Sequence, residues 1–190
     1  MLKAASVLAS GVESFVGTIV TDTDRRAFAR AFPELCDLAS SLGAAFEADV
    51  VHCNVRQMAT LFITPKCVAL TGEHRLHVVV PYQSIAALRH GRCGEPDGPG
   101  MPPKAILLPG RTAVAGGRPA RGEEEHEPVL MLFTKSRKMI PIFNIRPLAT
   151  RVGLDSDTGS DGEAFRVCFG AMEECWRDYR RTAARTARAA

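Results

Sequence analysis

Histidine and cysteine lie close together twice in this chain, and these residues could form a nucleophile–base pair or a metal site. His52 and Cys53 are adjacent, but neighbouring side chains on a strand point to opposite faces, so we expect a buried Cys53 and a surface His52. His90 and Cys93 could supply two metal ligands, but no second pair follows at zinc-like spacing. Glycine-rich phosphate loops, dinucleotide turns and glycine-flanked serines are also missing from the sequence. The sequence therefore predicts a protein without enzymatic activity, metal ion or cofactor.

Basic residues are the stronger functional signal. One lysine lies in a predicted turn with Arg56 near the preceding turn, a poor cluster by itself. Three more form the tip of a predicted hairpin, and four arginines at spacings of four, four and three share one side of a helix that the surrounding alanines favour. The alternatives are a solvated hairpin turn and a frayed, solvated chain end. The candidate binding residues are Lys66, Lys135, Arg137, Lys138, Arg177, Arg181, Arg185 and Arg188.

The segments that must position these residues are helical at first and then change period. Apolar residues from Phe28 to Leu42 recur at spacings of three and four, with Pro33 predicting a break in this helical segment. From Phe46 the period becomes two, and short β-branched segments joined by tight turns continue to residue 88. Further strands are predicted at 129–133 and 139–145, on either side of the basic tip. This order predicts an antiparallel β-meander.

Glycine and proline concentrate in residues 91–127, which predicts a long inserted loop with one short apolar segment at 105–108. After a polar stretch, Ser160 and Glu163 form a capping-box pair at the start of a helix. That helix has one apolar face, which includes Met172 and Trp176 and must lie against the sheet. We therefore divide the chain into an N-terminal arm at 1–30, one domain at 31–182 that contains the insertion, and a basic tail at 183–190. The predicted fold class is α+β, mainly β: an antiparallel roll or barrel capped by a C-terminal amphipathic helix, with an N-terminal helical segment.

Four segments resemble the GRAM domains, which share the pleckstrin-homology-like roll. AFPELCDL is similar to the entry segment of that family, and FEADVVHCNVRQMATLFITPKCVALTG resembles its first strands. LHVVVPYQSIAAL resembles the isoleucine–proline–aromatic segment, and MLFTKSRKMIPIFNI with the Trp176 helix resembles the later hairpin and cap. The resemblance covers about residues 32–179. It implies a binding module that recognises a membrane lipid or a protein.

Composition sets the remaining limits on function. Hydrophobic residues make up 46% of the 190 residues and charged residues 24%, as in an ordinary folded protein. The net charge of +3 is too balanced to require nucleic acid, and the cysteines lie mostly among apolar residues, as in a reducing cytoplasmic compartment. We expect a non-catalytic adaptor with a protein partner, an anionic membrane lipid being the other candidate, and no small-molecule substrate. The alternative is a structural subunit of a large, for example cytoskeletal, assembly, anchored by its termini and the 91–127 loop.

Overall fold

The computed structural model describes residues 20–53, 55–73, 75–92, 128–148 and 161–189. Its elements are α2 (Asp22–Ala31), η1 (Pro33–Ser41), β1 (Ala44–His52), β2 (Val55–Ile63), β3 (Cys67–Gly72), β4 (His77–Pro81), η2 (Tyr82–Ser84), β5 (Ile85–Arg92), β6 (Pro128–Thr134), β7 (Met139–Pro147) and α3 (Asp161–Ala189). Over these residues, no helix is both long and apolar enough to span a membrane. The predicted strand at 105–108, the capping residue Ser160 and the pair formed with Cys93 lie outside the described residues.

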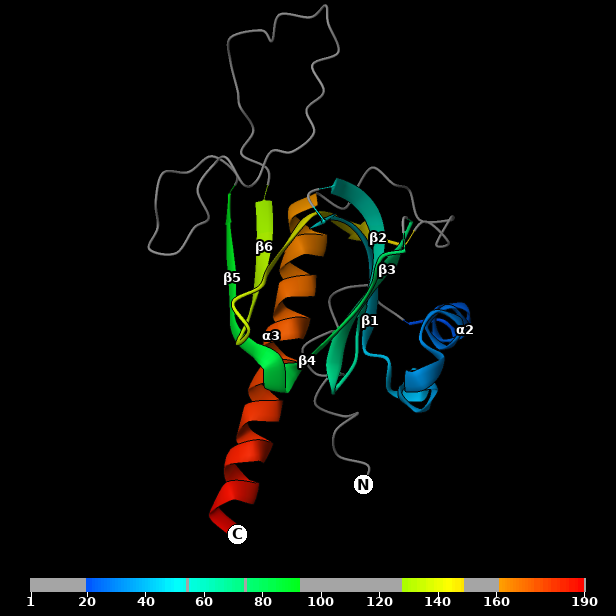
Figure 1. Ribbon diagram of the computed structural model, residues 1–190. Coiled ribbons are helices and arrows are strands. Elements are labelled where there is room, and N and C mark those ends of the chain that lie inside the picture. The colour runs from blue at the N-terminus through cyan, green and yellow to red at the C-terminus, as the bar shows by residue number, and fades with distance from the viewer. Residues whose placement is uncertain (1–19, 54, 74, 93–127, 149–160, 190) are drawn as a thin grey trace, which may run out of the picture.

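The seven strands form one antiparallel sheet in the order β4-β3-β2-β1-β7-β6-β5. β1 lies at the centre and pairs with β2 on one side and β7 on the other. The sheet curls around α3 into a half barrel, so that the edge strands β4 and β5 approach each other where η2 joins them (Figure 1). The predicted fold class is confirmed: the protein is α+β and mainly β, an antiparallel roll capped by its C-terminal helix.

The main hydrophobic core lies between the concave face of the sheet and α3. Alternate residues of each strand point inward, as period two requires, and on β1 these are Phe46, Ala48 and Val50. From α3 the buried residues are Phe165, Cys168, Met172 and Cys175. Their spacing of three and four is the one that the sequence predicted for the apolar face of this helix. Trp176, expected on that face, is only half-buried.

A second core covers the outer face of β2 and β3 with α2 and η1. The rings of Phe28 and Phe32 both pack on Phe62, which points outward from β2. α2 begins with a capping box between Thr21 and Asp24, and ends at Phe32. The predicted break at Pro33 is confirmed, because α2 ends there and a 3₁₀ segment begins.

Two apolar residues on or beside the first strands are exposed, and one of them, Cys53, was predicted in the core. Cys53 lies beyond the end of β1, in the hairpin turn, with a left-handed φ of 51°. Its Sγ atom is 3.8 Å from His52 Nε2, so these side chains do not diverge as two strand neighbours would. Met58 is 52% exposed, because it alternates with Leu61 and Ile63 rather than sharing their face. The prediction of a core Cys53 is therefore wrong.

Candidate functional site

The tip of the β6–β7 hairpin presents three cations on a turn that is closed by hydrogen bonds. The Thr134 amide donates to the Lys138 carbonyl at 2.9 Å, and the Arg137 amide donates to the Thr134 carbonyl at 2.9 Å. The Thr134 hydroxyl also accepts a hydrogen bond from the Lys138 amide at 3.0 Å. Arg137 has a left-handed φ of 62°, a conformation that costs a non-glycine residue energy. The side chains of Lys135, Arg137 and Lys138 are exposed, as the sequence predicted for this tip.

Lys66 lies in the turn between β2 and β3, which is built around the buried Thr64. The Thr64 hydroxyl accepts hydrogen bonds from the Lys66 amide at 3.3 Å and the Cys67 amide at 3.0 Å. It donates to the Cys67 carbonyl at 2.9 Å. Because Thr64 is fully buried, the hydroxyl replaces water as the partner of these backbone groups. The exposed Lys66 therefore stands on a turn whose backbone is fixed from inside.

The short η2 segment joins these two basic turns. The Tyr82 amide donates to the Lys66 carbonyl at 3.1 Å, and the Lys135 amide donates to the Ser84 carbonyl at 2.7 Å. Two turns that are almost seventy residues apart in sequence are thus held by the two ends of one three-residue segment. Lys66 and the hairpin tip lie at the same end of the roll, which we call the basic end.

Tyr82 fixes η2 against α3. Its side chain is 1% exposed, and its neighbours in the core include Cys175 and Cys168 of α3. Burial raises the pKa of Tyr82 far above that of an ordinary phenol, and the neighbouring Cys175 adds to the shift. Among the described residues the hydroxyl has no partner at full hydrogen-bonding geometry, although it interacts electrostatically with the neighbouring Cys175 thiol. Tyr82 therefore links the two basic turns to the capping helix mainly by packing, with the Cys175 thiol as its polar neighbour.

The arginine stripe (Arg177, Arg181, Arg185 and Arg188) is exposed along the last turns of α3. Those residues lie on the side of the helix opposite Cys168 and Met172, so the stripe faces away from the sheet. Figure 1 shows that this end of α3 runs past η2 and the hairpin tip. The stripe and the tip therefore lie toward the same end of the roll, although the stripe is a separate surface.

Charge is strongly segregated toward this end. The segments 64–66, 134–138 and 177–188 hold nine lysines and arginines and a single acidic residue, Asp178. Their formal charge is +8, whereas the whole chain carries +3. Such a concentration of one sign creates a local potential that attracts polyanions and raises their association rate.

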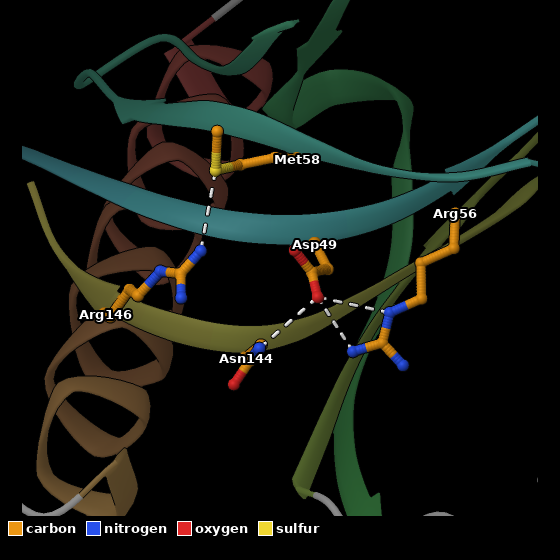
Figure 2. A network of polar contacts seen from close by, with 5 residues as sticks. All are labelled: Asp49, Arg56, Met58, Asn144 and Arg146. Carbon is orange, nitrogen blue, oxygen red and sulfur yellow. Dashed lines mark hydrogen bonds and ion pairs between the residues drawn. The ribbon is translucent and has the colours of Figure 1, made fainter.

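Arg56 does not belong to this end. It lies at the start of β2 and Lys66 follows the end of that strand, so the two occupy opposite ends of the roll. The Arg56 guanidinium donates to Asp49 Oδ2 at 2.9 and 3.2 Å and stacks 4.8 Å from the centre of the Phe143 ring. Asn144, in a left-handed conformation, donates to the same carboxylate oxygen at 3.3 Å (Figure 2). The Asp49 carboxylate therefore compensates the positive charge of Arg56.

The sequence did not indicate the network, because it depends on the register of three strands. Asp49 lies opposite Met58 on β2 and Phe143 on β7, with a bulge in the β1–β7 pairing next to it. The alternation of Glu47 and Asp49 on β1 predicts only that both point outward. Glu47 pairs with Arg146 at 3.4 Å. Figure 2 shows that a nitrogen of the same guanidinium approaches Met58 Sδ, at 3.5 Å.

Two of the described histidines, His77 and His90, pack against phenylalanine rings. His90 packs edge-on against Phe169 with ring centres 4.8 Å apart, and His77 stacks on Phe32 and lies 3.1 Å from Glu34. A backbone hydrogen bond and the contact with His77 lower the pKa of Glu34. Within the described ranges, no three histidine, cysteine, aspartate or glutamate side chains are grouped as metal ligands would be.

Comparisons with known proteins leave the family open. No protein-family model matches the chain, and no curated protein sequence matches it. Among solved structures, the chain is similar to the C-terminal domain of an unknown protein from Leishmania infantum. The two share 15% sequence identity with a TM-score of 0.40, over 63% of this chain and 83% of that one.

Proposed function

We propose that this protein is a non-catalytic, GRAM-type binding module that acts as a cytoplasmic adaptor and docks on an anionic partner through its basic end. The observation that carries the proposal is the pair of backbone hydrogen bonds from η2, which hold Lys66 and the hairpin tip together. A solvated turn needs no such support. Three fixed backbone segments under one patch of charge favour a surface that is preorganised for binding.

The proposed partner is a protein, with an anionic membrane lipid as the second candidate. A single-stranded nucleic acid is disfavoured, because no aromatic residue follows Tyr179 to stack on bases among the arginines. A small-molecule substrate is disfavoured because the cations stand on projecting turns and a projecting helix end.

Removal of the tip charges tests this proposal. We would combine Lys135→Gln, Arg137→Asn and Lys138→Gln; asparagine is chosen because it tolerates the left-handed backbone of position 137. The control removes three other exposed arginines, Arg26, Arg30 and Arg166, by change to glutamine. Both variants lose the same charge, so a difference between them reports position rather than net charge.

The assay measures binding of the full chain to poly-L-glutamate and, separately, sedimentation with phosphatidylcholine vesicles that contain or lack phosphatidylserine. We expect salt-sensitive binding to at least one anionic probe, weakened in the tip variant and retained in the control. Equal loss in both variants, or no binding to any anionic probe, would refute the proposal.

The second candidate function is a structural subunit of a large assembly. The observation in its favour is the end of α3, where residues 180–188 are exposed along about 13 Å of helix. In that case the native protein would elute from a sizing column only within a complex, and the purified chain would bind none of the anionic probes.

A further inference from the structure

The end of α3 is a preformed rod rather than a loose chain. The helix runs without interruption for 29 residues, and its first half is anchored in the core by Cys168 and Met172. An isolated helix of ten residues is unstable in water, but here the packed half supplies the nucleus and the alanines favour continuation. The free-energy cost of ordering the last turns when a partner binds them is therefore small.

The arginines are evenly spaced along this rod. Arg177 and Arg188 are eleven residues apart, so the four guanidinium groups of the stripe span about 16 Å of one helix face. Arg177 is paired with Glu173 at 2.9 Å and Arg181 with Asp178 at 3.2 Å. Over the described part of the chain, neither Arg185 nor Arg188 has an ion pair. The charge left uncompensated is thus greatest at the projecting end.

The earlier turns of α3 carry the opposite charge on the same outward side. Glu163, Glu173 and Glu174 lie within about 60° of the stripe around the helix axis and are half-buried, and they outnumber the single basic residue on that side of these turns, Arg166. A flat anionic membrane laid along the helix would contact these carboxylates as well as the arginines. Large apolar side chains, which anchor a helix at a membrane interface, do not occur after Tyr179. Both features disfavour a lipid surface for the stripe and favour a partner confined to the last turns.

The chemistry of the stripe fits carboxylates presented at helical spacing. Arginine forms bidentate hydrogen bonds with carboxylates and remains charged at all physiological pH values. Side chains at i, i+4, i+8 and i+11 of an acidic helix form a row of the same length as the stripe. We propose that Arg177, Arg181, Arg185 and Arg188 form a docking surface for an acidic helical segment of a protein partner. This inference rests on the proposed adaptor function and assigns a partner to the stripe.

Two designed alanine-based peptides test this proposal against the full-length chain. The matched peptide carries four glutamates at i, i+4, i+8 and i+11, and the spread peptide carries four glutamates distributed around its helix. We expect the matched peptide to bind more tightly in a fluorescence anisotropy titration. Arg185→Gln with Arg188→Gln should weaken that binding by about 1.5- to 5-fold per arginine, whereas the control Arg26→Gln with Arg30→Gln should leave it unchanged.

The outcomes separate the docking surface from the adaptor function on which it rests. Equal binding of the two peptides, or a loss confined to the hairpin-tip variant, overturns the docking surface and leaves the adaptor function standing. Binding to phosphatidylserine vesicles without binding to either peptide does the same and assigns the adaptor to a membrane. If no peptide, polyglutamate or vesicle binds, both proposals fail. Circular dichroism of each variant shows whether α3 remains folded.

Discussion

Tyr82 offers a sharp test of how the basic end is built, because its ring and its hydroxyl have opposite expected effects on stability. The ring is fully buried between η2 and α3. Truncation in Tyr82→Ala would leave a large cavity at this junction, and loss of a buried aromatic side chain costs about 3–5 kcal/mol. The hydroxyl, in contrast, is buried without a partner at full hydrogen-bonding geometry among the described residues, and the Cys175 thiol is its polar neighbour.

An unpaired buried hydroxyl costs about 1–3 kcal/mol of folding free energy. Tyr82→Phe removes it while keeping the ring, so we expect the free energy of unfolding to rise by about 1 kcal/mol. Tyr179→Phe is the matched control, because the half-buried Tyr179 is the other tyrosine of the chain, and we expect a near-neutral result there.

Urea unfolding of the full chain measures these changes, with an unchanged m-value as the condition for comparison. If Tyr82→Phe lowered stability by more than about 1 kcal/mol, the reasoning would be refuted. Such a result would mean that the hydroxyl bonds with the neighbouring Cys175 thiol. A smaller effect of Cys175→Ala in the Tyr82→Phe background than in the unmodified protein would identify that pair.

Three further predictions follow from burial. Burial raises the pKa of Cys168 and of Tyr82, so both side chains ionise first in the unfolded chain. Their contribution to stability should be constant at neutral pH and fall above about pH 8, with a shallower fall in Tyr82→Phe. A series of urea midpoints from neutral to alkaline pH measures this. The exposed Cys36 and Cys53 should react with a thiol reagent in the native protein, whereas reaction of the buried Cys168 should need unfolding. Mass spectrometry of the labelled peptides checks this, and rapid labelling of Cys168 would contradict the packing of α3. Trp176→Ala should lower the free energy of unfolding by about 1–3 kcal/mol, less than loss of a fully buried tryptophan. The reason is that the ring is only half-buried, with the Arg180 guanidinium 5.2 Å from its centre. A loss above about 4 kcal/mol would place the ring in the core.

Local patterns in the sequence predicted most of the fold. Period two marked the strands, and the three-and-four spacing of Phe165, Cys168 and Met172 predicted the face of α3 that is buried. The predicted hairpin tip is confirmed as a turn, because residues 134–138 are polar between two apolar strands. These features depend on neighbours in sequence, which a single chain displays directly.

Features that depend on long-range register were not predictable. Cys53 was expected in the core because the apolar pattern continues past the true end of β1. The contact of η2 with both basic turns joins Lys66 to Lys135, and no local pattern relates the two positions. The sequence therefore predicted the cations of the candidate site but not the η2 hydrogen bonds that hold them at one end of the roll.

Mapping where a polyanion binds is the most direct test of the basic end as a binding site. Backbone amide chemical shifts of the ¹⁵N-labelled full chain can be followed by NMR during titration with poly-L-glutamate. We predict salt-sensitive shifts in three places: at Lys66, at residues 134–138 and along the arginine stripe, with η2 responding because it joins the first two. Shifts concentrated instead at the opposite end, around Cys53 and Arg56, or spread evenly over the surface, would contradict the assignment of the basic end as the binding site.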